Sequence, residues 1–541
     1  MRLRIDIFFV FLVLCNAFLL LAFGKKVIGL DESQKTNMVR YVALENLVDF
    51  PQQGQYDQSG AIWNLHPGMS MYYSLDGGDH FVKADQVIDF YSLKNKDNLL
   101  LPTSFHWQRP FGDFPKALSL VLKAESDDKR VVTKEKVLTY FDNTVHDMPV
   151  ICIASKHSDL FSDENGIFAF GLSSWSEEGF YVDWWNRSAN FQNRGTAWKR
   201  DVSIQYFIQG SLALEQNCAL KISGNATRGF PQKSMQLIAS RTTDSDNFDY
   251  PFFGENGVKK YSSLTLRNSG NDNNKTLFAD LLMQEFAAGS NLITQQGKPV
   301  VVYLNGNYWG IYNLRERIDE FLIAEKEDVK LEDVTILEGG SIELKDGDDE
   351  VHQDFKILIE KINENGFSQN DELFFELSEQ IDMASFSDYI FFETFYANTD
   401  WPHNNCMWYK AGEKKWKWIL NDLDYGLAYL GKDAVELNLF EKLKNTSGAI
   451  SDLFNFLIAQ PEFKKSFKQN CENKIQTIFN PENIQTTFTT MQLQYVREIE
   501  RHCRRWRMID SVEDWEENCA GNLNFLLMRG EVYLKQVADL P

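Results

Sequence analysis

The segment that decides how this chain is interpreted is NTDWPHNN at residues 398–405, which is followed by NDLDYG at residues 421–426. Apolar residues recur at helical spacing from Met383 to Phe395 and predict a helix just before the first group. Trp401-Pro402 ends that helix, because proline disfavours helical geometry in the residue before it. WKWIL at residues 416–420 predicts a strand that leads into the second group. Asp400 and Asp424 are therefore expected in loops at the ends of regular elements, where catalytic side chains are common.

The spacing of the polar residues in these two groups is typical of phosphoryl transfer. Asp400 and Asn405 form Asp-x4-Asn, and Asp424 opens an Asp-aromatic-Gly triplet, which is the order in which protein kinases place a catalytic aspartate and two metal ligands. Mg2+ prefers hard oxygen donors and keeps several waters, so one amide oxygen and one or two carboxylates suffice. The spacing alone leaves a second interpretation open, a capped helix followed by an Asx turn, since Asp and Asn are frequent in both.

Four segments resemble the CotH family, the atypical kinases related to spore coat protein H. In chain order they are KISGNATRGFPQKS at 221–234, YLNGNYWGIYNLRER at 303–317, NTDWPHNN at 398–405 and DLDYG at 422–426. Four ordered motifs are much more specific than any one of them, and the similarity extends from about residue 140 to about residue 530. The resemblance implies an α+β fold: a kinase-like, two-lobed CotH domain with a helical C-terminal half. It also implies transfer of the γ-phosphoryl group of ATP, with Mg2+, to Ser or Thr hydroxyls of a protein partner such as a surface or coat protein.

The resemblance divides the chain into a front part and a catalytic part. The CotH kinase-like domain is predicted at residues 140–535. Residues 30–125 contain short predicted strands with turn signals, for example Met71 to Leu75 followed by Asp76-Gly77-Gly78. This part loosely resembles the chitobiase-C-like β-modules that precede such domains in secreted bacterial proteins. We therefore expect a small β-rich domain ahead of the CotH domain.

The resemblance also implies roles for individual residues in the two polar groups. Asp400 matches the catalytic aspartate, Asn405 matches a metal ligand, and Asp424 matches the metal-binding aspartate. Asp422 is a second candidate for that last role, because Asp422 and Asp424 lie on the same face of an extended segment.

Three further residues are predicted to serve the nucleotide. Lys233 matches a phosphate-contacting lysine, with an ordinary exposed strand lysine as the alternative. Glu285 lies on the predicted helix that follows, where a kinase places the glutamate that pairs with this lysine, and Asp280 on the same helix is a second candidate. Glu316 ends a predicted strand and is expected either to approach the nucleotide or to form a surface salt bridge with a neighbouring arginine.

Departures from ordinary kinases keep two other functions open. Gly224–Gly229 is not the glycine-rich loop of ordinary kinases, which allows a non-catalytic cell-surface or coat scaffold with a kinase-like fold. The paired acids, with aromatic clusters such as Trp184-Trp185, would also suit a carbohydrate-active surface protein. The sequence contains no Gly-x4-Gly-Lys-Ser/Thr, Gly-x-Gly-x-x-Gly or Gly-x-Ser-x-Gly, so P-loop NTPases, Rossmann dehydrogenases and α/β-hydrolases lose their ordinary support.

The charge balance excludes a further class of function. The 541 residues include 55 Lys and Arg against 77 Asp and Glu, a formal net charge of −22 that repels nucleic acid and anionic lipid. A nucleic-acid-binding protein would need a large basic patch to overcome this field, and the sequence contains no such patch. No nucleic-acid partner is therefore expected.

The N-terminus predicts export. Arg2 and Arg4 precede an apolar run from Ile7 to Gly24, which is typical of a cleaved signal peptide at residues 1–24 or, alternatively, of a signal anchor that attaches the chain to a membrane through this segment only. The folded part is therefore expected outside the cytoplasm, secreted or membrane-anchored. The six cysteines after this segment are interpreted as buried free thiols, with Cys503 and Cys519 as the pair best spaced for a disulfide.

Overall fold

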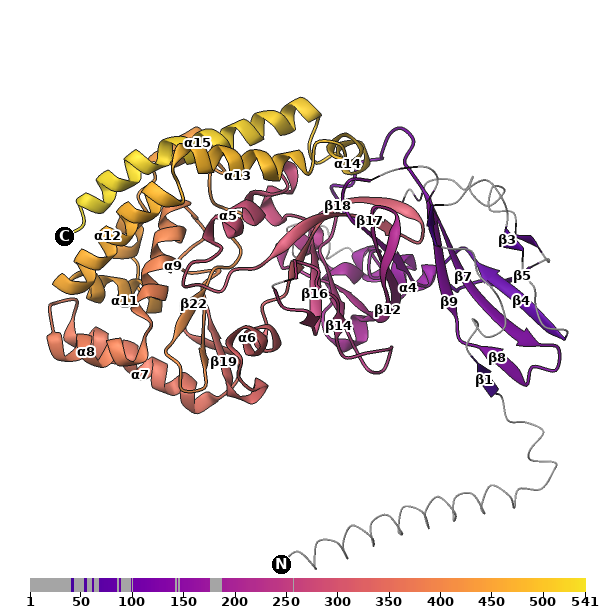
Figure 1. Ribbon diagram of the computed structural model, residues 1–541, viewed down its shortest axis with the longest axis horizontal. Coiled ribbons are helices and arrows are strands. Elements are labelled where there is room, and N and C mark those ends of the chain that lie inside the picture. The colour runs from indigo at the N-terminus through magenta and orange to yellow at the C-terminus, as the bar shows by residue number, and fades with distance from the viewer. Residues whose placement is uncertain are drawn as a thin grey trace, which may run out of the picture.

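The chain runs from a β-rich front part through a β-barrel to a helical C-terminal half (Figure 1). The computed structural model describes residues 40–42, 53–55, 61–62, 68–84, 87–88, 99, 101–141, 144, 146–175, 187–255 and 257–541. Helices and antiparallel sheets are both present and helices dominate the second half, so the fold is α+β, as predicted. The predicted signal segment at residues 1–24 and the Trp184-Trp185 pair lie outside the described residues.

The front part is a sheet built around strand β7. The strands are β1 (Arg40–Val42), β2 (Gly54–Gln55), β3 (Ala61–Ile62), β4 (Met69–Ser74), β5 (Val82–Lys83), β6 (Val87–Ile88), β7 (Ala117–Ser126), β8 (Val131–Thr133) and β9 (Lys136–Phe141). β7 pairs antiparallel with β4, β8 and β9, and its alternating Leu118, Leu120 and Leu122 pack into one small core. The strand predicted at Met71 belongs to β4. The boundaries of this domain and its likeness to chitobiase-C modules stay predictions.

A closed barrel follows, in the strand order β10-β11-β12-β13-β16-β18-β17. Its elements and the short pieces between them are β10 (Val150–Ala154), α4 (His157–Phe161), η2 (Leu172–Trp175), η4 (Asn190–Gln192), η5 (Thr196–Trp198), β11 (Arg200–Ile208), β12 (Ser211–Ile222), η6 (Ala226–Gly229), β13 (Met235–Ile238), β14 (Phe248–Asp249), β15 (Lys260–Tyr261), β16 (Ser263–Arg267), η7 (Gly270–Asn274), α5 (Ala279–Ala287), β17 (Gly297–Leu304) and β18 (Asn307–Glu316), where η marks a 3-10 turn. The sheet closes because β10 pairs in parallel with β17, with Ile151 opposite Val302. Leucines from neighbouring strands fill the interior, among them Leu220, Leu237 and Leu266.

The hairpin between β17 and β18 joins the front part to the barrel. Its turn is Asn305-Gly306, and both residues have positive φ angles, 46° and 74°, as a type I′ hairpin turn requires. The backbone N–H of Ala117 donates to the Gly306 carbonyl at 2.9 Å. A Cβ at Gly306 would collide with the Ala117 carbonyl, so glycine permits this close approach of two chain segments. The Asn305-Gly306 turn therefore forms part of the contact between the front sheet and the barrel.

The C-terminal half packs helices around a small sheet of order β20-β19-β21-β22. Its elements are α6 (Glu320–Glu327), η8 (Leu331–Asp333), β19 (Val334–Glu338), β20 (Glu343–Asp346), α7 (Asp349–Asn365), α8 (Asp371–Gln380), α9 (Met383–Phe395), β21 (Met407–Ala411), β22 (Lys417–Ile419), η9 (Lys432–Glu436), α10 (Leu439–Lys444), α11 (Ala449–Ile458), α12 (Pro461–Thr477), α13 (Pro481–Leu493), α14 (Ile499–Trp506) and α15 (Val512–Ala538). The long α15 and α13 run along one side of this half, and α7 and α8 lie on the opposite side (Figure 1). The helix and strand predicted around the two polar groups are α9 and β22.

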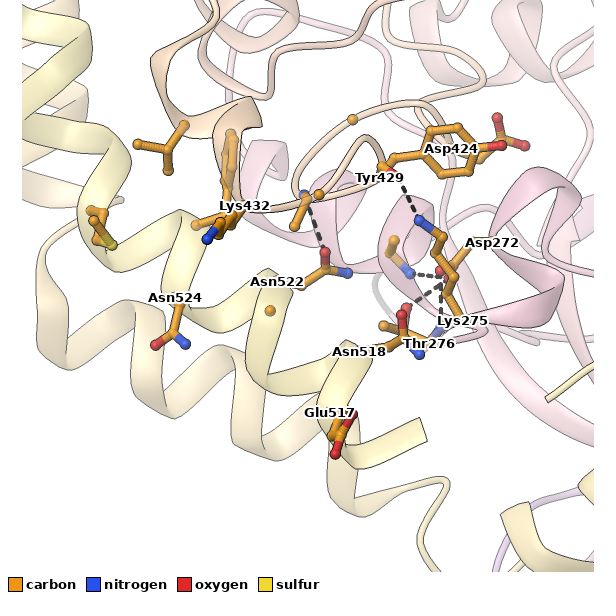
Figure 2. Close-up of a pocket in the computed structure, with 18 of the residues that line it drawn as sticks. Asp272, Lys275, Thr276, Asp424, Tyr429, Lys432, Glu517, Asn518, Asn522 and Asn524 are labelled. Carbon is orange, nitrogen blue, oxygen red and sulfur yellow. Dashed lines mark hydrogen bonds between the residues drawn. The ribbon is translucent and has the colours of Figure 1, made fainter. Parts of the chain in front are cut away.

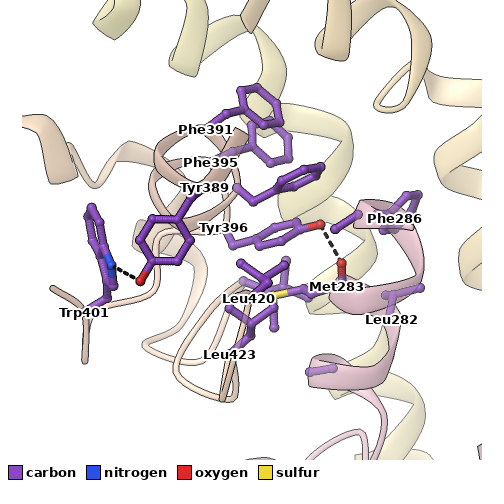
Figure 3. Close-up of a cluster of buried hydrophobic side chains, with 14 of the residues drawn as sticks. Leu282, Met283, Phe286, Tyr389, Phe391, Phe395, Tyr396, Trp401, Leu420 and Leu423 are labelled. Atoms are coloured by element: carbon purple, nitrogen blue, oxygen red, sulfur yellow. Dashed lines mark hydrogen bonds between the residues drawn. The ribbon is translucent and has the colours of Figure 1, made fainter. Parts of the chain in front are cut away.

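Helix α9 is the centre of this half. The Asp382 side chain caps its start by accepting a hydrogen bond from the Ser385 N–H at 2.9 Å. Every side chain from Ser385 to Phe395 is buried, so the helix is surrounded by protein. Tyr396, the residue just after its last turn, contacts α5: its hydroxyl donates to the Met283 carbonyl at 2.8 Å (Figure 3). A helix held on all sides provides a rigid base for the loop that follows it.

The expectation of free cysteines can be compared with the described residues. The cysteines within them, from Cys152 to Cys519, are all buried and form no disulfide with one another, including the pair Cys503 and Cys519. Within the described part of the chain, no helix combines the length and the apolar character needed to cross a membrane.

Candidate active site

Hydrogen bonds to α9 and from Arg529 of α15 hold the loop that follows α9. Trp401 Nε1 donates to the Tyr389 hydroxyl at 2.9 Å, which anchors the loop on α9 (Figure 3). Arg529, a fully buried residue of α15, donates to the carbonyls of Thr394 and Phe395 at 2.9 and 3.0 Å and to the Val435 carbonyl at 2.5 Å. The last carbonyls of a helix have no partner within the helix, so the Arg529 guanidinium satisfies the end of α9.

The Asp400 carboxylate is held by amides on its own loop. Asn404 Nδ2 donates to one Asp400 oxygen and Asn405 Nδ2 to the other, each at 2.9 Å. The Lys442 ammonium of α10 donates to the carbonyls on either side of Asp400, those of Thr399 at 2.7 Å and Trp401 at 2.5 Å. The carboxylate is thus positioned by neutral donors, and a cation holds the backbone around it.

The second acidic group lies directly beside this loop. Asn405 Nδ2 also donates to the Asp422 carbonyl at 3.3 Å, which links the two groups. Asn405 and Asp422 have φ angles of 60° and 56°, a left-handed conformation that Asn and Asp tolerate better than most residues. Such conformations cluster at functional sites, where the surrounding structure enforces them.

The Asp424 carboxylate is buried and approached from the barrel side. The Asn271 backbone N–H donates to one of its oxygens at 2.9 Å and Asn271 Nδ2 to the other at 3.1 Å. Arg267, at the end of β16, places Nη2 2.7 Å from Asp424 and in contact with Asp422. Burial and the negative charge of Asp422 raise the pKa of Asp424, while Arg267 and Asn271 act against that rise. A Cβ at Gly270 would collide with the Asp424 carboxylate, so the chain needs glycine there.

These groups surround one cavity of about 680 Å³ between the barrel and the helical half. Its lining includes Asp400, Asn405, Asp422 and Asp424, which the structure therefore brings together from the two polar groups of the sequence. The barrel contributes Arg267 and the loop at residues 223–227, and the segment from Glu338 to Ser341 closes another side. The volume is in the range of cavities that hold small molecules.

Lys233 takes a different position. It is fully buried, and its ammonium donates to the carbonyls of Arg228 at 2.7 Å and Phe230 at 3.0 Å and lies 3.6 Å from the Phe191 ring centre. Burial and the positive charge of Arg228 lower its pKa well below the usual range. Lys233 is not among the described residues that line the cavity. It shapes the loop that does so, and its contact with phosphate stays a prediction.

The two glutamates predicted to serve the nucleotide also lie away from the cavity lining described above. Glu285 is exposed on α5, whereas Asp280 on the same helix is buried and pairs with Arg315 at 2.7 Å. Glu316 is buried and pairs with Lys326 of α6 at 2.7 Å, so it does not form a surface salt bridge with a neighbouring arginine. The acid of α5 that meets barrel cations is therefore Asp280, the second candidate.

Arg267 and Asn271 lie at the site but were not predicted from the sequence. Leu264 and Leu266 point into the barrel core, so strand alternation places Arg267 on the opposite face, where β16 borders the cavity. Both residues lie just before the predicted helix α5, but this position in the sequence does not indicate that they bind Asp424.

The donor set fits a magnesium ion. Asp422 and Asp424 both reach the same nitrogen of Arg267, which shows that one cation can contact both carboxylates. Both hydrogen bonds described for the Asn405 side chain use Nδ2, so its Oδ1 can serve as a further ligand. In the described part of the chain no three His, Cys, Asp or Glu side chains form a metal-binding group. Two carboxylates and an amide oxygen, completed by water, are the kind of ligation that Mg2+ accepts.

A second cavity, of about 370 Å³, lies on the other side of Asp424 between η7, α15 and the loop that leads to η9 (Figure 2). Figure 2 shows the Lys275 ammonium on the Tyr429 carbonyl, 2.5 Å away, and Asp272 beside it. Asp272 accepts hydrogen bonds from the Thr276 N–H and hydroxyl and from the Ala279 N–H at 2.7 to 2.9 Å. Despite these donors, burial raises the pKa of Asp272 to about 6.

Asp272→Asn is expected to change how stability depends on pH. Because the folded-state pKa is raised above the unfolded value, Asp272 contributes stability that is fully present below about pH 4 and is lost as the pH rises through about 6. The difference in unfolding free energy between wild type and variant should therefore be larger at pH 4 than at pH 7, by roughly 3 kcal/mol for a shift of two pKa units. Urea unfolding at both pH values measures it. The exposed Asp433→Asn is the control, and an equal difference at both pH values would contradict the assignment.

Comparison with known proteins identifies the family. A family model described as CotH kinase protein matches residues 220–533, and no curated protein matches the sequence. The match covers more than half of the chain and contains all four segments that suggested the family. It begins at residue 220 rather than near residue 140, where the resemblance was expected to start. The chain belongs to the CotH kinase family.

Proposed function

We propose that the protein is an exported atypical protein kinase that transfers the γ-phosphoryl group of ATP, with Mg2+, to Ser or Thr hydroxyls of a surface or coat protein. The observation that carries this proposal is the convergence of Asp400, Asn405, Asp422 and Asp424 on one cavity of about 680 Å³. Secretion, or anchoring through residues 1–24, is part of the proposal and is supported by the basic and apolar pattern of that segment.

The contacts of each residue of the site support the role that we assign to it. Asp400, held through both oxygens by Asn404 and Asn405, orients the acceptor hydroxyl and accepts its proton. Asn405, Asp422 and Asp424 present the oxygen atoms that would hold the metal ion. Bound Mg-ATP supplies the phosphoryl group and the neutralisation of charge on it. Residues 223–227 and Glu338 to Ser341 form further parts of the wall of the same cavity.

Calorimetry of the purified protein with ATP, with and without Mg2+, tests this function. Binding heat should require Mg2+ and should be lost in Asp424→Asn, because one of the two carboxylates then no longer carries charge. Radiolabelled ATP should give phosphate incorporation into protein for wild type and none for the variant. A wild type without magnesium-dependent heat would instead favour the non-catalytic scaffold. Magnesium-dependent nucleotide heat without any transfer would indicate a binding-only member of the family.

A further inference from the structure

Arg267 places a positive charge among the carboxylates that are proposed to hold the metal. One nitrogen, Nη2, contacts Asp422 and lies 2.7 Å from Asp424, while Nε lies 3.4 Å from Asp280. The Asp424 and Asp280 side chains are almost completely buried, so their charges are poorly screened by water. Two neighbouring acids in such a place need a cation. In the protein itself that cation is the Arg267 guanidinium.

The surroundings of Arg267 also offer it a second position. Asp280 is already paired with Arg315 at 2.7 Å through Oδ2, and it keeps this partner if Arg267 moves. The other oxygen of Asp280, Oδ1, is buried and has no hydrogen-bond partner among the described residues, and the same is true of Arg267 Nε. A small rotation of the arginine side chain can therefore exchange the contacts to Asp422 and Asp424 for a contact to Asp280 without leaving Arg267 unpaired.

The backbone around Arg267 fixes where this exchange occurs. Thr265 and Arg267 both line the cavity from β16, opposite the loop at residues 223–227. Gly270 follows on the same turn and leaves room for the Asp424 carboxylate and for Arg267 Nη2, both of which a Cβ would strike. Arg267 therefore faces the same cavity in which we propose that Mg-ATP binds.

We propose that Arg267 and the metal ion compete for the same two carboxylates. Arg267 occupies Asp422 and Asp424 when no divalent cation is bound, and it moves to Asp280 and the nucleotide phosphates when Mg2+ takes its place. This inference rests on the proposed kinase function and adds a residue to it: Arg267, rather than Lys233, is the cation that contacts phosphate. It also means that Mg2+ alone binds weakly, because each binding event must displace an internal ion pair.

Calorimetric titration with MgCl2 in the absence of nucleotide tests the competition directly. Arg267→Met removes the positive charge that competes with Mg2+ for Asp422 and Asp424. Mg2+ binding should tighten by about tenfold or more, because Mg2+ then no longer has to displace a guanidinium that lies 2.7 Å from Asp424. Arg317→Met is the matched control, because Arg317 lies just beyond β18, 4.0 Å from Asp319, and should leave Mg2+ binding unchanged. The rise in melting temperature on adding Mg2+ should likewise be larger for Arg267→Met than for wild type.

The outcomes separate this inference from the proposed function. Equal or weaker Mg2+ binding by Arg267→Met, in a protein whose wild type binds Mg-ATP, overturns the competition and leaves the kinase proposal standing. A wild type that binds no Mg-ATP overturns the kinase proposal, and the competition with it. If the methionine variant does not fold, Arg267→Gln provides the same test, because it keeps a hydrogen-bond donor for Asp424 and lacks the charge. An unchanged Mg2+ affinity in Arg267→Gln also overturns the inference.

Discussion

Asp400→Asn is expected to lower phosphoryl transfer by about two to four orders of magnitude, the usual contribution of a positioned general base. The asparagine side chain has nearly the same shape but cannot accept the proton of the acceptor hydroxyl. The fold should survive, because Asp400 is only half-buried and its partners, Asn404 and Asn405, lie on the same short loop. Transfer from radiolabelled ATP to protein measures the loss, and near-ultraviolet circular dichroism checks the tertiary structure.

A matched variant shows whether the loss belongs to the site. Glu413→Gln also replaces a carboxylate by an amide, in the exposed turn between β21 and β22, and should retain wild-type transfer. Magnesium-dependent ATP binding should persist in Asp400→Asn, because the carboxylates of Asp422 and Asp424 are untouched. Full transfer activity in Asp400→Asn would refute the role of Asp400, whatever the control does.

Of the proposed variants, Arg529→Met is expected to lower the free energy of unfolding most, by about 3 to 5 kcal/mol. The arginine satisfies three buried carbonyls, those of Thr394, Phe395 and Val435, and a methionine satisfies none of them. Each buried carbonyl left without a donor costs about 1 to 3 kcal/mol, and the apolar side chain recovers part of that cost by packing. Chemical denaturation monitored by tryptophan fluorescence measures the difference.

The effect of Arg529→Met should also reach the site. The carbonyls of Thr394 and Phe395 end α9 a few residues before Asp400, so their release should loosen the loop that carries Asp400. Transfer activity should therefore fall even at temperatures where the variant is folded. Arg497→Met, which changes an exposed arginine paired with Asp147, should alter stability by no more than about 0.5 kcal/mol. A loss of that small size in Arg529→Met would contradict the structural role.

The sequence was most informative where chemistry is local. Asp400 and Asn405 are separated by one short loop, and Asp422 and Asp424 by one residue, so spacing indicated each pair, and the resemblance to the CotH family implied their roles. The short hairpin of β21 and β22 connects the two pairs, because its antiparallel pairing places Met407 opposite Ile419 and so brings the outer ends of both strands together. The meeting of Asn405 with the Asp422 carbonyl is the result of that short connection.

The contacts of the cations could not be predicted in the same way. Lys233 was interpreted from its motif, but its burial depends on Phe191, which reaches it from 42 residues earlier in the chain. Arg267 meets Asp422 and Asp424 across more than 150 residues, and only the register of β16 in the barrel decides that it faces the cavity. Asp280 and Glu285 lie on one short helix, and packing against the barrel selects Asp280. Such choices are made by tertiary structure.

The parallel pairing of β10 with β17 has a mechanical consequence. A sheet that bends round and bonds to itself has no free margin, so it resists splaying and sliding of its strands far better than an open sheet does. The barrel, which forms one wall of the cavity, should therefore be rigid. We expect the barrel to keep its shape when a ligand enters or leaves the cavity.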